Sequence, residues 1–206
     1  MTDWVLFKKD FVKPIEEMID RYNNVEPKDV YEERYVVPGD KLSLDFKDDA
    51  ERWITEIFYD FKENNSVLLF GAGHSFYSNY FLKQCVGVNK FYAVDFVDAS
   101  SVGLDKRIDF FNTDILKEDL PVSCDYIFTT HTLEHFTKPE IFDVVLPRFF
   151  LAAKKAIVIV VPYGNNWPNE PNHKCRFYEN DELAALSSRY KIIRGGAEIV
   201  YWINRS

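Results

Sequence analysis

The stretch that decides the fold of this chain is Ser66-Val67-Leu68-Leu69-Phe70-Gly71-Ala72-Gly73. Its short apolar run is typical of a buried parallel strand, and its two glycines predict a turn at the end of that strand. A glycine here lets the backbone approach a ligand closely, because no Cβ is in the way. The next segment, 75–85, has helical spacing of its large residues, and the N–H groups at its start would face an anionic group. Strand, glycine turn and helix are how an open α/β sheet begins a nucleotide site.

From this stretch onward, short apolar segments alternate with helical ones. Strands are predicted at 67–70, 91–94, 108–110, 126–129, 156–161, 191–194 and 199–204, and helices at 75–85, 138–153 and 180–189, with weaker helices after Asp98 and Asp114. The pair Gly195-Gly196 between the last two strands predicts a hairpin, so the sheet should finish with an antiparallel strand. We therefore expect an α/β fold with a doubly wound, mostly parallel seven-stranded sheet, helices on both faces and an antiparallel last strand.

Residues 1–62 lack this alternation. Segments 11–22 and 48–61 within them carry apolar residues at helical spacing, which predicts two helices. We interpret 1–62 as a helical amino-terminal extension and 63–206 as the main domain.

Composition and charge limit the classes of function. The chain has 206 residues, 47% of them hydrophobic and 17% aromatic, with a formal net charge of −8. This is a globular composition, and the acidic balance argues against a nucleic-acid partner, which needs a concentrated basic face. The three cysteines have neither metal-ligand nor disulfide-framework spacing, which favours reduced thiols and a cytoplasmic protein. The longest apolar run is strand-sized and the first residues do not form a signal peptide, so no membrane association is expected.

Acidic residues follow the second and third predicted strands, at the edge where open α/β sheets bind ligands. Asp95 ends the second strand, about 20 residues beyond the glycine turn, where a carboxylate can accept hydrogen bonds from ribose hydroxyls. Asp114 follows the third strand and is placed to accept from an adenine amino group, with Ile115 against the ring. Aspartates in such positions also serve as ordinary caps of helices and turns.

The fourth strand leads into Thr129-Thr130-His131-Thr132-Leu133-Glu134-His135. His131 is a candidate general base because the ordinary pKa of histidine lies near neutrality, and a buried hydrogen-bonded histidine is the simpler alternative. Glu134 and His135 are candidates for orienting it. Tyr163 closes the fifth strand and His173 lies beyond a proline-rich loop, so both are candidate substrate contacts.

In their order, these segments resemble the class I S-adenosylmethionine-dependent methyltransferases of the small-molecule group. The resemblance covers roughly 66–205 and includes the glycine motif at 67–73, the acid of Ala93-Val94-Asp95, the adenine-side motif Thr113-Asp114-Ile115, the fourth-strand motif at 124–135, Val160-Val161-Pro162 and a later segment at 173–183. It implies a Rossmann-like methyltransferase fold. It also implies S-adenosylmethionine as the cofactor and a small-molecule acceptor methylated at an oxygen or a nitrogen.

The resemblance also implies roles for individual residues. The implied cofactor-binding residues lie near the ends of the first four strands. They are Gly71, Ala72, Gly73, Ser75, Asp95, Phe96, Thr113, Asp114, Ile115 and Thr130. His131 and His135 are then the catalytic candidates, Tyr163 and His173 contact the acceptor, and no metal is expected. The aromatic residues of the extension suggest a lid over the acceptor, with simple packing against the sheet as the alternative. The residues do not indicate the oligomeric state.

Three alternatives remain open. Leu69 stands where the family usually has an acidic residue and Ser75 where it usually has a glycine, so a non-catalytic relative of the same fold is the first. The run from His131 to His135 also spells H-x-x-E-H, a zinc hydrolase motif whose two histidines share a metal. A nicotinamide-dependent enzyme is the third, although Phe76 stands where the dinucleotide fingerprint has its third glycine.

Overall fold

The structure is a computed structural model that describes residues 65–73, 78–79, 81–82, 87–98, 103–165, 172–193 and 198–205. The extension 1–62, with its two expected helices and the possible lid, lies outside these residues, as do Ser75 and the Gly195-Gly196 pair. Of the expected helix 75–85, residues 78–79 and 81–82 are described, and they are helical.

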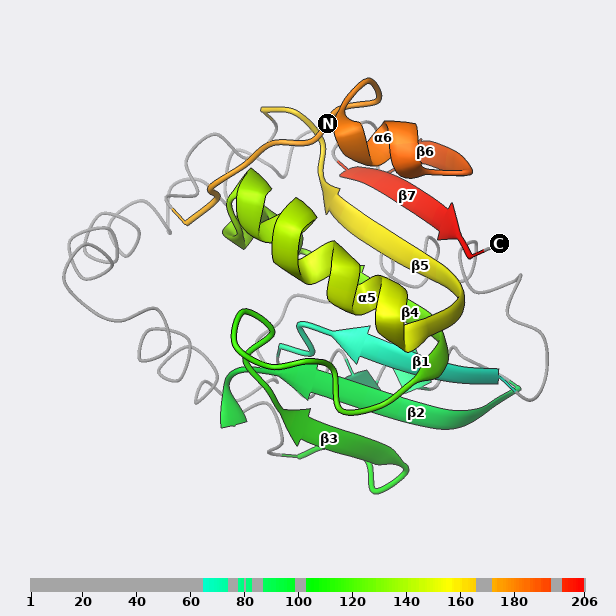
Figure 1. The fold of residues 1–206 in the computed structure, drawn as a ribbon. Helices are drawn as coiled ribbons and strands as arrows, with labels where there is room; N and C mark the ends of the chain where they lie inside the picture. Colours follow the sequence, from blue (N-terminus) through cyan, green and yellow to red (C-terminus); the bar gives the residue numbers. More distant parts are fainter. Residues whose placement is uncertain are drawn as a thin grey trace, which may run out of the picture.

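All seven predicted strands are present and form one sheet (Figure 1). They are β1 (Asn65–Phe70), β2 (Val88–Asp95), β3 (Ile108–Asn112), β4 (Cys124–Thr130), β5 (Ala153–Pro162), β6 (Arg189–Ile193) and β7 (Glu198–Asn204). The order across the sheet is β3-β2-β1-β4-β5-β7-β6. The first five strands are parallel, and β7 runs antiparallel to both β5 and β6. The predicted fold class, including its antiparallel last strand, is therefore confirmed.

The strand order reverses direction at β1 and β4, which lie side by side although β2 and β3 separate them in the sequence. Ligands of open α/β sheets bind beyond the carboxyl ends of the strands at such a switch point. The glycine turn follows β1 and the histidine segment follows β4, so the switch point brings the two sequence motifs to one edge.

The helix predicted at 138–153 is present but not uniform. Residues Glu140–Val145 form the π-helical segment η4, and α5 spans Leu146–Ala152. Pro147 has no N–H to donate to the carbonyl of Asp143, and just before it the ladder widens so that the N–H of Leu146 reaches the carbonyl of Ile141. The apolar spacing predicted the helix but not this local widening.

The other two predicted helices in this part of the chain need correction. Helix α6 is confined to Glu182–Leu186, capped by Asp181, because β6 already begins at Arg189. The weaker helix expected after Asp114 is wrong: a turn follows, in which the carbonyl of Asp114 accepts from the amides of Lys117 and Glu118 at 2.9 Å each.

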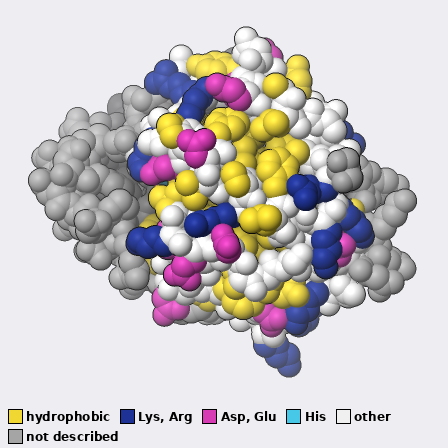
Figure 2. Space-filling model, in the orientation of Figure 1, with side chains coloured by type: hydrophobic (Ala, Val, Ile, Leu, Met, Phe, Trp, Pro, Cys, Tyr) yellow, Lys and Arg dark blue, Asp and Glu magenta, His cyan; other side chains and the backbone are white. Residues whose placement is uncertain are grey.

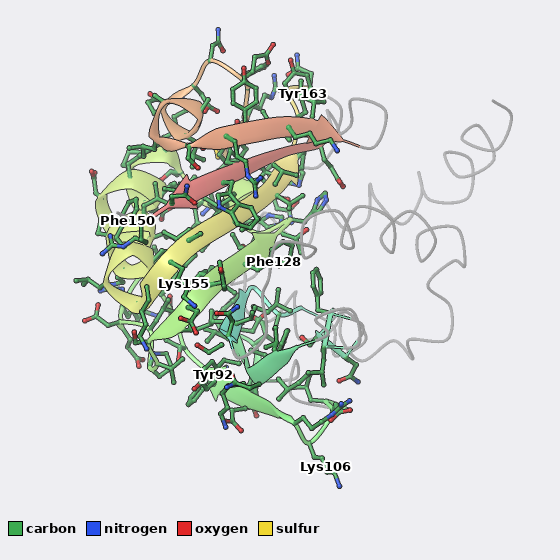
Figure 3. The ribbon with its side chains drawn as sticks, turned by 90° about the vertical axis from the view of Figure 1, so that its right-hand side faces the viewer. Tyr92, Lys106, Phe128, Phe150, Lys155 and Tyr163 are labelled. Carbon is green, nitrogen blue, oxygen red and sulfur yellow. The ribbon has the colours of Figure 1, made fainter. Side chains whose placement is uncertain are left out.

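Apolar side chains cover both faces of the sheet. On the α5 face, Phe70 meets Phe149 edge-on with ring centroids 5.0 Å apart. On the opposite face, the helical residue Phe81 packs on Phe128 at 4.7 Å. Each of these fully buried rings contributes about 1.5–3 kcal/mol of transfer free energy. Figure 3 shows α5, with Phe150, on one side of the sheet, and marks β5 by Lys155 near its start and Tyr163 just past its end.

The face seen in Figure 2 mixes positive, negative and hydrophobic side chains, and its described residues form no continuous basic stripe. None of the helices in the described ranges combines the length and the hydropathy that a membrane crossing requires.

Candidate functional site

The glycine turn after β1 is held to β2 by its backbone. Gly71 and Gly73 both have left-handed backbone angles, with φ of 69° and 57°. The amides of Gly71 and Ala72 donate to the carbonyl of Val94 at 2.9 and 3.1 Å, and the amide of Gly73 donates to Asp95 Oδ2 at 2.8 Å. Three successive N–H groups therefore donate hydrogen bonds within the protein. The turn would contact a ligand through its Cα atoms and carbonyl oxygens.

The missing side chain of Gly71 makes room for Thr132. A Cβ at Gly71 would lie 2.1 Å from Thr132 Oγ1, well inside contact distance. The Thr132 hydroxyl in turn donates to the carbonyl of Thr130 at 3.0 Å. The missing side chain of Gly71 is therefore required by the loop after β4, and the close approach of a ligand at this glycine remains a prediction.

Asp95 is buried at the end of β2, with 3% of its surface exposed. Its Oδ2 accepts from Gly73 and its Oδ1 accepts from the amide of Val97 at 3.0 Å. A carboxylate has about four lone-pair sites, so each oxygen can accept a further hydrogen bond. The chemistry expected of a ribose acceptor is thus compatible with the bonds that already fix this side chain.

The adenine-side candidates lie beside Asp95. The amide of Thr113 donates to the carbonyl of Asp95 at 2.9 Å. Asp114 Oδ1 accepts from the amide of Leu116 at 3.0 Å, and its Oδ2 pairs with Lys117 Nζ at 2.7 Å. Ile115 is buried in the core on the α5 face. Asp114 therefore caps a turn, as the simpler alternative had it, and its adenine role remains a prediction.

His131 has the only positive φ, 49°, among the non-glycine residues in the described ranges. Its amide donates to the carbonyl of Val160 at 2.9 Å, which fixes the strained backbone beside β5. Its Nε2 lies 2.6 Å from Glu198 Oε1, and its Nδ1 lies 3.4 Å from Glu134 Oε1. Backbone strain of this kind persists where the surroundings over-determine it, and it clusters at functional sites.

The residue that sequence reasoning missed is Glu198. It is completely buried at the first position of β7, opposite Pro162 at the end of β5. Because β7 is antiparallel, its first residue reaches the edge where the parallel strands have their last. The available signal was a charged residue opening the apolar strand Glu198-Ile199-Val200-Tyr201-Trp202, since a buried carboxylate needs a partner.

The two carboxylates determine the charge of His131. Burial alone would lower its pKa, but Glu134 and Glu198 raise the pKa of His131 to about 10. For Glu134 the signs are reversed: burial raises its pKa, but the neighbouring His131 lowers it below its usual range. His131 is then protonated at neutral pH and must release that proton before it can accept another. Its role as a general base remains a prediction.

His135 and His173 form a second pair beside Glu134. Their rings meet edge-on with centroids 5.2 Å apart, and His173 Nε2 lies 3.9 Å from Glu134 Oε1. The segment that carries His173 is anchored by the carbonyl of Glu134, which accepts from the amides of Lys174 and Cys175 at 2.7 and 3.4 Å. The structure thus brings three predicted residues, His131, His135 and His173, around one buried carboxylate.

The helical H-x-x-E-H arrangement is not formed. The short 3-10 helix η3 covers only Leu133–His135, and His131 lies before it with a left-handed backbone. The two histidines therefore do not occupy successive turns of one helix, as that zinc motif requires.

Tyr163 has different neighbours. Its hydroxyl hydrogen-bonds Glu179, and its ring lies 6.1 Å from that of Tyr178. Thr130, at the end of β4, has a buried hydroxyl without a hydrogen-bond partner in the described part of the chain. Phe96 is half-buried after β2. The ligand contacts expected of these three residues remain predictions.

Comparison with known proteins gives the fold. No family model and no curated protein matches the chain. Among solved structures, the complex of DhpI with S-adenosylhomocysteine has a TM-score of 0.63 at 15% identity, over 85% of this chain and 92% of that one. The N-methyltransferase NodS of Bradyrhizobium japonicum, also bound to S-adenosylhomocysteine, has a TM-score of 0.62 at 11% identity, over 84% and 95%.

A third structure, the Burkholderia thailandensis 1,6-didemethyltoxoflavin-N1-methyltransferase with its substrate and S-adenosylhomocysteine, has a TM-score of 0.58 at 19% identity, over 78% of this chain and 80% of that one. At such identities the likeness concerns the fold. It agrees with the strand order, the antiparallel β7 and the glycine turn at the switch point. The chain therefore has the seven-stranded Rossmann-like fold of the class I S-adenosylmethionine-dependent methyltransferases.

Proposed function

We propose that this protein is an S-adenosylmethionine-dependent methyltransferase that transfers a methyl group to an oxygen or nitrogen of a small molecule. The observation that carries the proposal is the bond from the Gly73 amide to the buried Asp95 carboxylate, at the switch point of this fold. Solved structures of the same fold, at low identity, are methyltransferases bound to S-adenosylhomocysteine, the product that the cofactor leaves.

The residues at the ends of β1, β2 and β3 fit such a cofactor. We assign the two ribose hydroxyls to Asp95, whose carboxylate is oriented by Gly73 and Val97. Beside it, Thr113 and Asp114 border the adenine side. We assign the remaining cofactor contacts to the other residues that the resemblance named: Gly71, Ala72, Ser75, Phe96, Ile115 and Thr130.

When bound, S-adenosylmethionine supplies a methyl group on a sulfonium, which an acceptor lone pair displaces in line. The chain's own task is to hold the acceptor in that line and to exclude water. We assign this task to the histidine segment, with His131 and His135 as catalytic candidates and His173 and Tyr163 as acceptor contacts. The His131 side chain is 29% exposed, which leaves surface for an acceptor to contact.

A non-catalytic relative of the same fold is the second candidate. Leu69, which stands where the family usually has an acidic residue, is 1% exposed and packs in the core. It therefore offers no polar group to a ligand. Such a relative would bind S-adenosylhomocysteine weakly or not at all and would methylate nothing.

The free thiols of Cys124 and Cys175 support a reducing compartment, and we place the protein in the cytoplasm.

The experiment that tests the proposal is calorimetric titration of the protein with S-adenosylmethionine and S-adenosylhomocysteine. Micromolar binding is expected, with a loss of about tenfold or more in Asp95→Asn, since that change removes the charge while keeping the shape. The matched control is Asp109→Asn, an exposed aspartate on β3 paired with Lys90, which should bind like the wild type. Absence of binding to both ligands by the folded wild type would refute the proposal.

An acceptor screen follows, with release of S-adenosylhomocysteine as the readout. Turnover with any small molecule supports the enzyme, whereas binding without turnover across oxygen and nitrogen acceptors supports the non-catalytic relative.

A further inference from the structure

The Glu134 carboxylate is the least satisfied buried charge of the site. It is 1% exposed, and neither of its oxygens accepts a hydrogen bond from any residue that the structure describes. The nearest nitrogens are His131 Nδ1 at 3.4 Å and His173 Nε2 at 3.9 Å from Oε1. A buried carboxylate without donors is expensive unless a cation or ordered water compensates it. His131 carries one positive charge between the two buried carboxylates Glu134 and Glu198, so a second cation beside Glu134 would balance this cluster.

Two imidazoles offer ligand atoms at the same place. One ligand atom each from Glu134, His135 and His173 lies within 4.8 Å of the others. Ligands bound to one ion at about 2.0–2.2 Å are separated by roughly 3–4 Å, so the three atoms need to approach one another by only about an ångström to bind one ion.

The tautomer of His135 suits a metal ligand. Its Nδ1 lies 3.2 Å from the carbonyl oxygen of Asn172, which can only accept, so Nδ1 carries the proton. In the neutral ring, Nε2 then carries the lone pair. An imidazole whose other nitrogen donates to a backbone carbonyl is the usual arrangement around protein-bound metals, because the bond fixes both tautomer and ring orientation.

From these observations we propose that Glu134, His135 and His173 form a binding site for a divalent transition-metal ion of the zinc class. Two imidazoles and one carboxylate suit Zn²⁺ better than Mg²⁺, which prefers oxygen ligands. Three protein ligands leave a fourth position for water or an oxygen-bearing ligand. The sequence did not predict this metal site. It differs from the H-x-x-E-H hydrolase arrangement because the second histidine ligand is His173 and not His131.

His131 is not a member of the group whose ligand atoms all lie within 4.8 Å of one another. Its Nε2 contacts Glu198 at 2.6 Å. The buried Glu198 balances the charge of His131, so a metal ion at Glu134 would not face an uncompensated cation.

The test uses the full chain, stripped with a chelator and dialysed. We expect it to take up about one Zn²⁺ or Co²⁺ per chain, measured by elemental analysis after removal of excess metal, and to show the visible Co²⁺ absorption of a tetrahedral site. Wild-type protein that takes up no more metal than His135→Gln/His173→Gln would overturn the proposal. The measurement does not involve methyl transfer, so it stands or falls separately from the proposed function.

Single variants identify the ligands. His173→Gln and Glu134→Gln should each lose metal affinity tenfold or more, whereas Glu182→Gln, at an exposed glutamate paired with Lys138, should bind like the wild type. Circular dichroism shows that each variant is folded before it is titrated. Loss of metal in His131→Gln with retention in His173→Gln would refute the ligand set in favour of the motif histidines.

Discussion

The ends of β1 and β2 are held by backbone groups, whereas the ends of β4 and β5 are held by buried charges. At the first pair, three successive amides of the glycine turn bond to Val94 and Asp95. At the second, Glu134 and Glu198 lie on either side of His131, whose own backbone is strained. The difference teaches that the β1–β2 end of this edge depends on glycine geometry and the β4–β5 end on charge pairing. The two sides should therefore respond to different kinds of substitution.

The largest effect is expected from Gly71→Ala. The new Cβ would overlap the Thr132 side chain, and alanine would be forced to keep a φ of 69°. We expect a loss of about 2–5 kcal/mol in the free energy of unfolding, from overpacking and left-handed strain together. Urea unfolding followed by circular dichroism measures it.

Gly164→Ala is the matched control for this change. Gly164 has a similar φ of 58°, but its Cβ would lie 3.2 Å from the edge of the Tyr178 ring. It should cost only the strain, about 1–2 kcal/mol. Equal losses in the two variants would contradict the role given to Thr132.

Glu198→Gln should have the next largest effect, because it removes charge from a fully buried partner of His131 at the same shape. We expect a loss of about 2–3 kcal/mol in unfolding free energy, the range for hydrogen bonds to buried charged groups. Glu182→Gln is the matched control: its pair with Lys138 is exposed, and it should cost under about 0.5 kcal/mol. Similar losses at both positions would show that the β4–β5 end does not depend on buried charge.

The smallest effect is expected at the opposite edge, where the strands begin. There Asp125 accepts from the amide and hydroxyl of Ser66, both at 2.9 Å, and pairs with Lys155 at 3.2 Å. Burial raises the pKa of Asp125, but these partners together lower it below its usual range. The stability that the Asp125 carboxylate contributes is therefore complete above the pKa that this aspartate has in the unfolded chain. It is lost as the pH falls through the lower pKa that Asp125 has in the folded protein.

Asp125→Asn should accordingly cost about 1 kcal/mol at neutral pH and progressively less in acid. Unfolding of both proteins measured at pH values from neutrality to below the usual aspartate range tests this. A difference that stays constant or grows as pH falls would contradict the assignment.

The sequence predicted most of the fold, because the apolar runs of β1, β4 and β5 are buried on both faces and so read as strands without ambiguity. It did not predict the π-helical turns before Pro147 or the early end of α6, which depend on local hydrogen bonds rather than on apolar spacing. The predicted strands are shorter than those in the structure, because polar residues such as Asn65 and Arg189 extend them.

Polar residues at the ends of the predicted strands indicated the candidate site. They predicted that Asp95 and His131 lie at the same edge of the sheet. The partners of those residues were harder to find. Glu198 reaches this edge only because β7 is antiparallel, and Thr132 fills the space at Gly71 only because β4 lies beside β1. Such contacts follow from the sheet order, which sequence spacing does not contain.

The pair of His131 and Glu198 also has a consequence for the folding of the chain. The two residues are 67 positions apart, and β6 pairs with β7 rather than with β5. Because β7 pairs directly with β5, that pairing must form before Glu198 can reach the histidine. The bond from Gly73 to Asp95 joins residues 22 positions apart, so it costs less loop-closure entropy than the contact of His131 with Glu198. The glycine-turn end of this edge therefore closes at a lower entropic cost than the His131–Glu198 end.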